Sequence, residues 1–248
     1  MSTIAHKEYL LPFNVEEALA SSKEVDPWIA RFAGLRSDEV TEILRQEWGE
    51  TRSPAVASFR DAMIAFKPIS VIHSDDDRSG GFYRGWWVRM KGPRNYHEWE
   101  TEFFLQTRPD RTALNKCIDQ YTISEREVVS EFYWYYYKLV NSIDLISGFV
   151  PPPWPRIEES VYYDYLEPSD CHPDPDREWR AAYCIYVTDT GQYVLLKPNG
   201  EVGWFLVAEN RIIAMAPTFS EFLEQCALCY RIYGVLLYYT VWESQFNM

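Results

Sequence analysis

The chain has 248 residues, and its 37 acidic against 24 basic side chains give it a formal net charge of −13. A chain of this length buries roughly 70% of the surface that it exposes when unfolded. It can therefore form one large or two small domains without disulfide bonds or structural metal ions to stabilise them. The acidic balance argues against a protein whose main role is to bind nucleic acid, and no segment approaches the ~20 apolar residues of a membrane-spanning helix.

The amino-terminal part predicts helices over four ranges: 15–22, 27–32, 37–48 and 53–66. The third begins at a Ser37 cap, and the acidic residues that follow suit the positive end of a helix. The fourth has Pro54 at its first helical position, where the missing amide hydrogen costs nothing. The chain then changes to patterns that predict strands over three ranges: 69–73, 83–90 and 96–106.

Opposite charges mark the second and third of these strands. The range 78–94 has five basic residues, no acidic residue and several aromatic rings, which taken alone is typical of a surface that stacks bases and binds phosphates. The third strand alternates glutamates with Trp99, Thr101 and Phe103, so we expect one of its faces to be exposed to solvent. Because pairing would place arginines opposite glutamates, we expect the charges to cancel, and we do not expect nucleic-acid binding.

A further helix is expected in the middle of the chain. Ser124 and Glu127 fit a capping box, which opens a helix through about Ser142. The proline-rich range 151–155 ends this region, since proline continues neither a helix nor a central strand. Four residues fall on one stripe of the expected helix: Val128, Phe132, Tyr135 and Leu139.

The last quarter of the chain contains the strongest local signals. Four ranges predict short strands: 183–187, 193–196, 201–207 and 211–215. Asn199 and Gly200 can supply the positive φ angles of a tight turn, so the strands beside them should pair antiparallel. Thr218 and Glu221 fit a second capping box, which starts a helix directly after the last strand. Strands grouped apart from helices predict an α+β fold with a mainly antiparallel sheet and helices packed on it.

Three features here point to a known family. Trp179 precedes the first of these strands, Gly200 begins a Gly-Glu-Val step, and residues 218–223 read Thr-Phe-Ser-Glu-Phe-Leu. Together they resemble the carboxy-terminal half of the SMI1/KNR4-like family, also called the SUKH superfamily, in which a tryptophan-led strand, a glycine turn and such a helix start recur. The resemblance covers at best residues 120–240.

The resemblance implies a domain organisation and a function. We interpret 120–248 as a SUKH-like α+β domain, and 1–110 as helices plus a three-strand segment that forms either a separate domain or an extension. The family implies a non-enzymatic protein-binding module, and many bacterial members look like immunity proteins that neutralise a cognate toxin by covering its surface. The fungal branch of the family implies a regulatory or scaffold module instead.

An acidic and aromatic segment over 157–176 is the candidate contact surface. It holds seven acidic residues and no basic residue, interleaved with apolar and aromatic side chains. Such a surface would steer a basic protein partner, while the plainer alternative is a solvated loop that binds nothing. The residues expected to make the contact are Tyr162, Tyr163, Asp164, Tyr165, Glu167, Asp170, Asp174 and Asp176.

Two groups of residues offer weaker signals of metal chemistry: Cys226 and Cys229 with Cys171 and His172, and His73 with Asp75, Asp76 and Asp77. The first group has the two-residue gap of a zinc site, but all four residues would have to converge, and cysteines buried on a helix face are the plainer interpretation. The second group offers oxygens to a hard cation but lacks the glycine placements of a calcium loop, so a solvated turn is the plainer interpretation.

No stronger signal of catalysis is present. No serine lies in a nucleophile elbow, and no glycine loop is arranged to cradle a phosphate. We therefore expect no enzymatic activity, no metal and no cofactor, with a metal-dependent hydrolase as the alternative from another class. The start of the chain lacks the pattern of a signal peptide, and five cysteines in no regular framework suit a reducing compartment, so we expect a soluble, cytoplasmic protein.

Overall fold

The computed structural model describes residues 6–20, 24–49, 51–74, 85–94, 100–137, 139–141, 148–157, 178–187, 192–206, 209 and 211–233. In this part of the chain ten strands form one antiparallel sheet, and each strand pairs with the next along the sequence. The strands are β1 (His6–Leu10), β2 (Lys67–Ser74), β3 (Gly85–Arg94), β4 (Glu100–Gln106), β5 (Val140–Asn141), β6 (Gly148–Phe149), β7 (Tyr183–Val187), β8 (Tyr193–Leu196), β9 (Val202–Leu206) and β10 (Arg211–Ala216). The helices are α1 (Val15–Leu19), α2 (Pro27–Ala30), α3 (Ser37–Glu47), α4 (Pro54–Ile64), α5 (Arg111–Asp119), α6 (Arg126–Tyr136) and α7 (Phe219–Tyr233). The predicted α+β fold with a mainly antiparallel sheet is confirmed.

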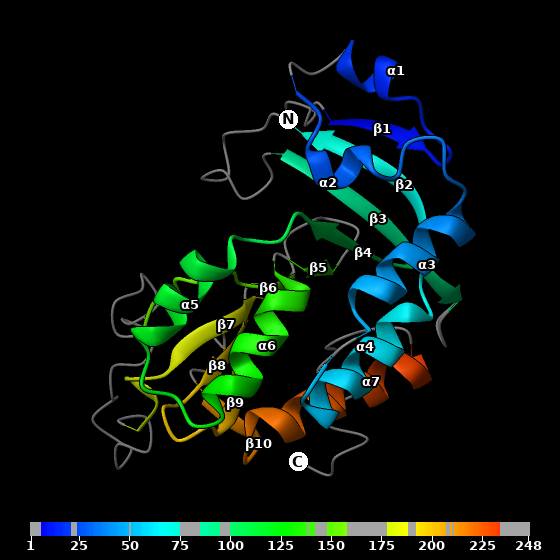
Figure 1. Ribbon diagram of the computed structural model, residues 1–248. Coiled ribbons are helices and arrows are strands. Elements are labelled where there is room, and N and C mark those ends of the chain that lie inside the picture. The colour runs from blue at the N-terminus through cyan, green and yellow to red at the C-terminus, as the bar shows by residue number, and fades with distance from the viewer. Residues whose placement is uncertain are drawn as a thin grey trace.

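The sheet has two parts, β1–β4 and β7–β10, which the two-residue strands β5 and β6 connect (Figure 1). Helix α3 packs against β2, where the Ser37 hydroxyl donates to the Pro68 carbonyl at 2.5 Å. Helix α6 contacts β7 through the Tyr133 hydroxyl, which donates to the Ile185 carbonyl at 3.3 Å. Helices α4 and α7 lie side by side, although more than 150 residues separate them in the sequence.

Besides two smaller clusters, the described core contains one large buried cluster with residues from both halves of the sequence, from Tyr9 to Tyr230. Phe59 on α4 lies at its centre and is fully buried. Its ring centroid lies 5.3 Å from that of Phe132, 5.8 Å from that of Tyr230 and 6.1 Å from that of Phe149, each in an edge-to-face arrangement. Aromatic rings therefore hold α4 against α6, α7 and β6, which accounts for much of the high aromatic content.

The four expected amino-terminal helices are present, with one correction at a cap. Ser53 caps α4 as predicted, because its hydroxyl accepts from the Val56 amide at 3.4 Å. The N-cap of α3 is Arg36, however, and Ser37 is the first helical residue. The Glu39 carboxylate accepts from the Arg36 amide at 2.8 Å, so an acidic side chain satisfies this end while the Ser37 hydroxyl bonds to β2.

The central helix differs more from its prediction. It ends at Tyr136 rather than near Ser142, because the chain turns into β5, which pairs with β4. Of the predicted stripe, Phe132 and Leu139 are buried as expected, but Val128 and Tyr135 are only partly buried. The residues of α6 that face the core are Val129, Phe132, Tyr133 and Tyr136.

The capping box predicted for Ser124 and Glu127 is wrong as well. The N-cap of α6 is Glu125, in the left-handed conformation with φ of 58°, and its side chain does not cap its own helix. The Glu125 carboxylate instead accepts hydrogen bonds from the amide of Ser220, at 3.2 Å, and from the Ser220 hydroxyl. It thus binds the first turn of α7, where a carboxylate meets unsatisfied amides and the positive end of the helix dipole.

The carboxy-terminal meander agrees closely with the prediction. All four strands form, and the Glu221 amide donates to the Thr218 hydroxyl at 3.2 Å, which confirms half of that capping box. The Glu221 carboxylate accepts from the Thr218 hydroxyl rather than from its amide. In the turn between β8 and β9 only Gly200 has a positive φ, of 96°, and the Asn199 side chain accepts from the Glu201 amide instead.

A second carboxylate of α6 caps another helix and permits a direct test. Glu131 accepts from the amides of Arg52 and Ser53, the latter at 2.8 Å, and so binds the start of α4. Replacing Glu131 with alanine removes two charge-assisted hydrogen bonds, so we expect the free energy of unfolding to fall by about 1–2 kcal/mol. Chemical denaturation would measure the loss, with exposed Glu127→Ala on the same helix as the control. Equal stability of the two variants would contradict the capping role.

Candidate functional site

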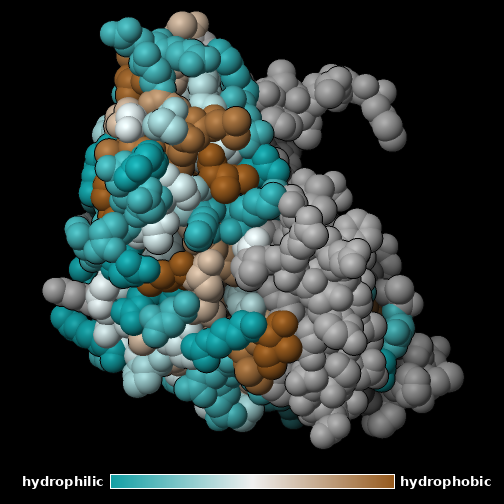
Figure 2. Space-filling view, turned by 90° about the vertical axis from the view of Figure 1, so that its right-hand side faces the viewer, coloured by the Kyte–Doolittle hydropathy of each residue, from teal (hydrophilic) through white to brown (hydrophobic). Residues whose placement is uncertain are grey.

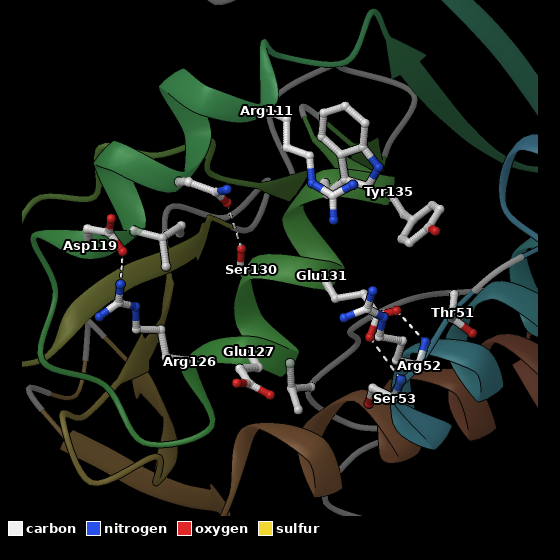
Figure 3. Close-up of a pocket in the computed structure, with 14 residues that line it drawn as sticks. Thr51, Arg52, Ser53, Arg111, Asp119, Arg126, Glu127, Ser130, Glu131 and Tyr135 are labelled. Carbon is white, nitrogen blue, oxygen red and sulfur yellow. Dashed lines mark hydrogen bonds and ion pairs between the residues drawn. The ribbon is translucent and has the colours of Figure 1, made fainter.

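A cleft of about 950 Å³ lies beside α6, bounded by α5 and by the start of α4 (Figure 3). Three arginines line it, each at or next to the first turn of a helix: Arg52 before α4, Arg111 at the start of α5 and Arg126 at the start of α6. Trp134 and Tyr135 supply partly exposed aromatic surface from the last turns of α6. The cleft thus combines aromatic rings with guanidinium groups on three rigid helices.

Trp134 holds two guanidinium groups near its ring. The Cζ atom of Arg111 lies 5.2 Å from the ring centroid, and the Cζ atom of Arg108 lies 5.6 Å from it. Arg108 also lies 5.6 Å from the centroid of Tyr135. Cations within about 6 Å of an aromatic ring are attracted by its quadrupole, so these contacts orient both arginines.

The two stacked arginines differ in what else they contact. Arg108 donates to the Glu47 carboxylate at 3.0 Å, and burial lowers its pKa while the Glu47 charge opposes that change. Glu47 also accepts from the indole of Trp28, at 3.1 Å, and from Arg31. Arg108 is therefore part of an internal network. Arg111 is exposed and has no carboxylate partner among the described residues.

The acidic residues of the cleft are mostly engaged. Asp119 at the end of α5 forms an ion pair with Arg126 at the start of α6, and Glu131 binds the amides before α4. Arg52 forms no ion pair with any described residue. The described lining has three arginines and three carboxylates, so its formal charge is zero. Arg52 and Arg111 are the arginines of this lining that have no carboxylate partner among the described residues.

The local sequence explains how these groups are placed. Asp110 caps α5 by accepting from the Ala113 amide at 2.8 Å, which fixes Arg111 as the first helical residue. Leu114 and Ile118 then bury the opposite face of α5. On α6, burial of Tyr133 and Tyr136 turns the residues between them toward solvent, so Trp134 and Tyr135 face the cleft.

The residues predicted to bind a partner cannot be compared with this cleft. All eight, Tyr162, Tyr163, Asp164, Tyr165, Glu167, Asp170, Asp174 and Asp176, lie outside the described residues, as do Cys171, His172 and Asp75–Asp77. The acidic segment therefore stays a prediction. The sequence did not single out the cleft, because its residues come from three separate segments and nothing in their local patterns places Arg111 beside Trp134.

The cysteine pair on α7 faces the core. Cys226 and Cys229 are both buried, and burial raises the pKa of Cys226 well above its ordinary value and that of Cys229 to about 12. Burial likewise raises the pKa of Cys184 on β7 to about 12. Within the described ranges, no group of three or more His, Cys, Asp or Glu side chains is placed to hold a metal ion. The structure thus supports the interpretation of this pair as buried helix-face residues.

These pKa values predict low thiol reactivity. A thiol with a pKa near 12 is ionised in roughly one molecule in 10,000 at pH 8, and only the thiolate attacks an alkylating reagent. We therefore expect iodoacetamide to modify Cys226 and Cys229 only in the unfolded chain, and half-buried Cys117 to react first among the described cysteines. Peptide mapping by mass spectrometry would show this, and rapid native labelling of Cys226 would contradict its burial.

In the described part of the basic and aromatic stretch, Arg89 on β3 is paired with carboxylates, as expected. Arg89 donates to both carboxylate oxygens of Glu102 on β4, at 2.7 and 2.5 Å, and to Glu8 on β1 at 2.7 Å. Trp86 and Trp87 are 7% and 3% exposed, so neither ring offers a face on which a base could stack. The pairing of arginine with glutamate across these strands is confirmed for Arg89 and Glu102, and the expectation of no nucleic-acid binding stays a prediction.

The exposed apolar surface of the described part is small and scattered. Its large exposed hydrophobic residues are Leu10, Leu19, Leu228 and Ile232. On the face shown in Figure 2, apolar atoms form separate patches between hydrophilic side chains. Within the described helices, none combines the length and the apolar character needed to cross a membrane.

Comparison of the chain with protein-family models, with curated proteins and with solved structures found no match. The similarity to the SMI1/KNR4-like family therefore stays a prediction from the sequence. Trp179, one of its three features, lies in a short turn before β7 rather than in the strand itself. The inference of function depends on the geometry of the cleft.

Proposed function

We propose that this chain is a non-enzymatic protein-binding module. The observation that carries the proposal is the cleft beside α6, where Trp134, Tyr135 and Arg111 are accessible on rigid helices. Tryptophan, tyrosine and arginine are the residues that most often supply the binding energy of protein interfaces. The two aromatic side chains offer a large contact area at low entropic cost, and arginine offers several hydrogen-bond donors on a planar group.

We further propose that the partner is a basic protein, and that the chain acts as an immunity protein that neutralises it as a toxin. The net charge of −13 supports this, because long-range attraction speeds the association of oppositely charged proteins. A regulatory or scaffold protein of the same fold would use the same cleft, and the two roles differ in whether the partner is toxic by itself.

Affinity capture tests the proposal. The tagged chain would be incubated with its native lysate at low and moderate salt, and bound proteins identified by mass spectrometry. We expect one stoichiometric basic partner whose binding weakens as salt increases. Co-expression then separates the two roles, since an immunity protein must rescue cells from its partner. Failure to capture any stoichiometric partner would contradict the proposed function.

Two variants locate the binding site. Trp134→Ala removes the central ring of the cleft, and we expect it to weaken capture by about tenfold or more. Ile232→Ala removes an apolar side chain that is 50% exposed on α7, outside the cleft, and should leave capture unchanged. Equal capture by both variants would exclude the cleft as the contact surface, although the chain would remain a binding module.

A further inference from the structure

Trp134, Arg111 and Arg52 mark one end of the cleft as positive. At the other end Asp119 pairs with Arg126, and the exposed carboxylate of Glu127 lies nearby. That end has one arginine and two carboxylates, so its formal charge is −1. Near Trp134 the lining carboxylate is Glu131, which is already bonded to two backbone amides. The Trp134 end, with Arg52, Arg111 and the Glu131 carboxylate, therefore has a formal charge of +1, while the described lining as a whole is neutral.

Arg111 is prepared to bind an anion. Its guanidinium plane is held near the Trp134 ring, which fixes the side chain and leaves N–H groups free to donate. A guanidinium group binds a carboxylate through two parallel hydrogen bonds, and prior ordering lowers the entropic cost of forming them. Arg108 on the same ring is partly buried and already pairs with Glu47, whereas Arg111 is exposed, so Arg111 is the member of the pair that faces an incoming ligand.

Arg52 approaches from a different side of the cleft. It belongs to the segment before α4, whereas Arg111 starts α5, and the two side chains enter the cleft from separate elements (Figure 3). A single phosphoryl group is best held by arginines that converge on it, while two separated arginines suit two anionic groups spaced along one ligand. The volume of about 950 Å³ is at the upper end of the range for small-molecule pockets and admits several residues of a peptide.

From these observations we propose that the Trp134 end of the cleft binds a short acidic segment of the protein partner, with one carboxylate on Arg111 and a second on Arg52. This inference rests on the proposed function. The negative charge of the whole chain attracts a basic protein, and the positive Trp134 end of the cleft then accepts an acidic segment of it. The positive Trp134 end and the negative remainder of the chain together fix the orientation of a basic partner that has an acidic segment. Any other orientation would place like charges of the two proteins together.

A defined peptide tests this inference without the natural partner. The probe is a fluorescein-labelled, ten-residue peptide in which glutamate alternates with alanine around one tyrosine, and its binding to the full chain is followed by fluorescence anisotropy. Matched peptides replace the glutamates with glutamine or lysine, and a fourth carries one phosphoserine and no glutamate. We expect the glutamate peptide to bind at least tenfold more tightly than the other three, and increasing salt to weaken it.

Variants connect the binding to the proposed residues. Arg111→Gln and Arg52→Gln should each weaken the glutamate peptide by about tenfold, the loss expected for one charge-assisted hydrogen-bonded pair. Arg111→Lys keeps the charge but loses the planar guanidinium group. Its affinity for the glutamate peptide should therefore lie between that of the unaltered chain and that of Arg111→Gln. Arg45→Gln is the matched control, because Arg45 is an exposed arginine on α3 that already pairs with Glu42. Unchanged thermal melting would show that each variant is folded.

The outcomes separate this inference from the proposed function. Equal affinity for the glutamate and glutamine peptides, or no loss on Arg111→Gln, would overturn the acidic segment even if the chain captures a protein partner. Tighter binding of the phosphoserine peptide would also overturn it, in favour of a phosphoryl ligand. Conversely, Arg111-dependent binding of the glutamate peptide by a chain that captures no partner would support the cleft and contradict the proposed function.

Discussion

Replacing Phe59 with alanine is expected to destabilise the chain by about 3–5 kcal/mol, the range measured when large aromatic residues are removed from protein cores. Phe59 is fully buried on α4, and its ring contacts aromatic rings from α6, α7 and β6. The substitution removes apolar area from the core and leaves a cavity that rigid helices cannot close. Since whole domains are stable by about 5–15 kcal/mol, one change removes a large share of the total.

Chemical denaturation would measure the loss as a lower midpoint at unchanged slope. Leu19→Ala is the control, because Leu19 is 47% exposed on α1 and should change stability by less than about 0.5 kcal/mol. Hydrogen exchange adds a test of domain organisation. We expect Phe59→Ala to speed exchange in α7 as well as in α4, because the two helices share one core. Faster exchange confined to the first 110 residues would indicate a separate amino-terminal domain.

The strands were predicted well where local signals decide structure. The meander from β7 to β10 follows from aromatic and β-branched runs separated by turn residues, and Thr218 marks the start of the helix that follows. These signals act within a few residues of one another. Tertiary contacts therefore had little chance to override them, and the limits of the four strands agree with the sequence within two residues.

The central helix shows where periodicity fails. Between Val128 and Leu139 almost every residue of the sequence is apolar or aromatic, so several stripes fit equally well. Contacts with α4 and α7 select the stripe that contains Phe132 and Tyr136. Helix α5 was missed, although Asp110 is a good N-cap and Leu114 and Ile118 have helical spacing. Strand β1 was missed because its pairing with β2 joins residues that are 60 to 68 positions apart.

The cleft was beyond sequence reasoning for a related reason. Its arginines and aromatic rings come from the starts of α4 and α5 and from the end of α6, and only the packing of these helices brings them together. Local rules place acidic residues, not arginines, at the start of a helix. Arg111 at the start of α5 departs from that rule, and departures of this kind are expected at functional sites.

The second large effect on stability is expected where Trp179 packs against Gly203. Its indole is 7% exposed, and the Lys197 ammonium group lies 4.2 Å from the ring centroid. The same ammonium group donates to Glu201 at 2.8 Å and to Glu178 at 3.2 Å. On β9, Gly203 lies against the six-membered part of the indole, where a Cβ atom would stand only 2.5 Å from a ring carbon. The tryptophan therefore fits between a lysine and a strand position without a side chain.

Replacing Gly203 with valine should therefore destabilise the chain by about 3 kcal/mol, the upper end of the cost of overpacking a core. The direction of the change in stability shows whether the clash with Trp179 is its cause. Valine favours strands and glycine disfavours them, so without the clash the same change would be neutral or stabilising. Denaturation midpoints of the two proteins measure the effect. A valine variant as stable as the parent would show that Trp179 moves aside freely.

A smaller side chain at position 179 should rescue the valine. Trp179→Leu alone loses buried area and its contact with Lys197, so it should be destabilising by itself. In the double variant the space vacated by the indole accepts the valine methyl groups, and the total loss should be smaller than the sum of the two single losses by about 1–2 kcal/mol. Strict additivity would mean that the two residues do not share this space. Because Trp179 precedes β7 and Gly203 lies in β9, the coupling would also show that their contact fixes how the chain before β7 lies on the sheet.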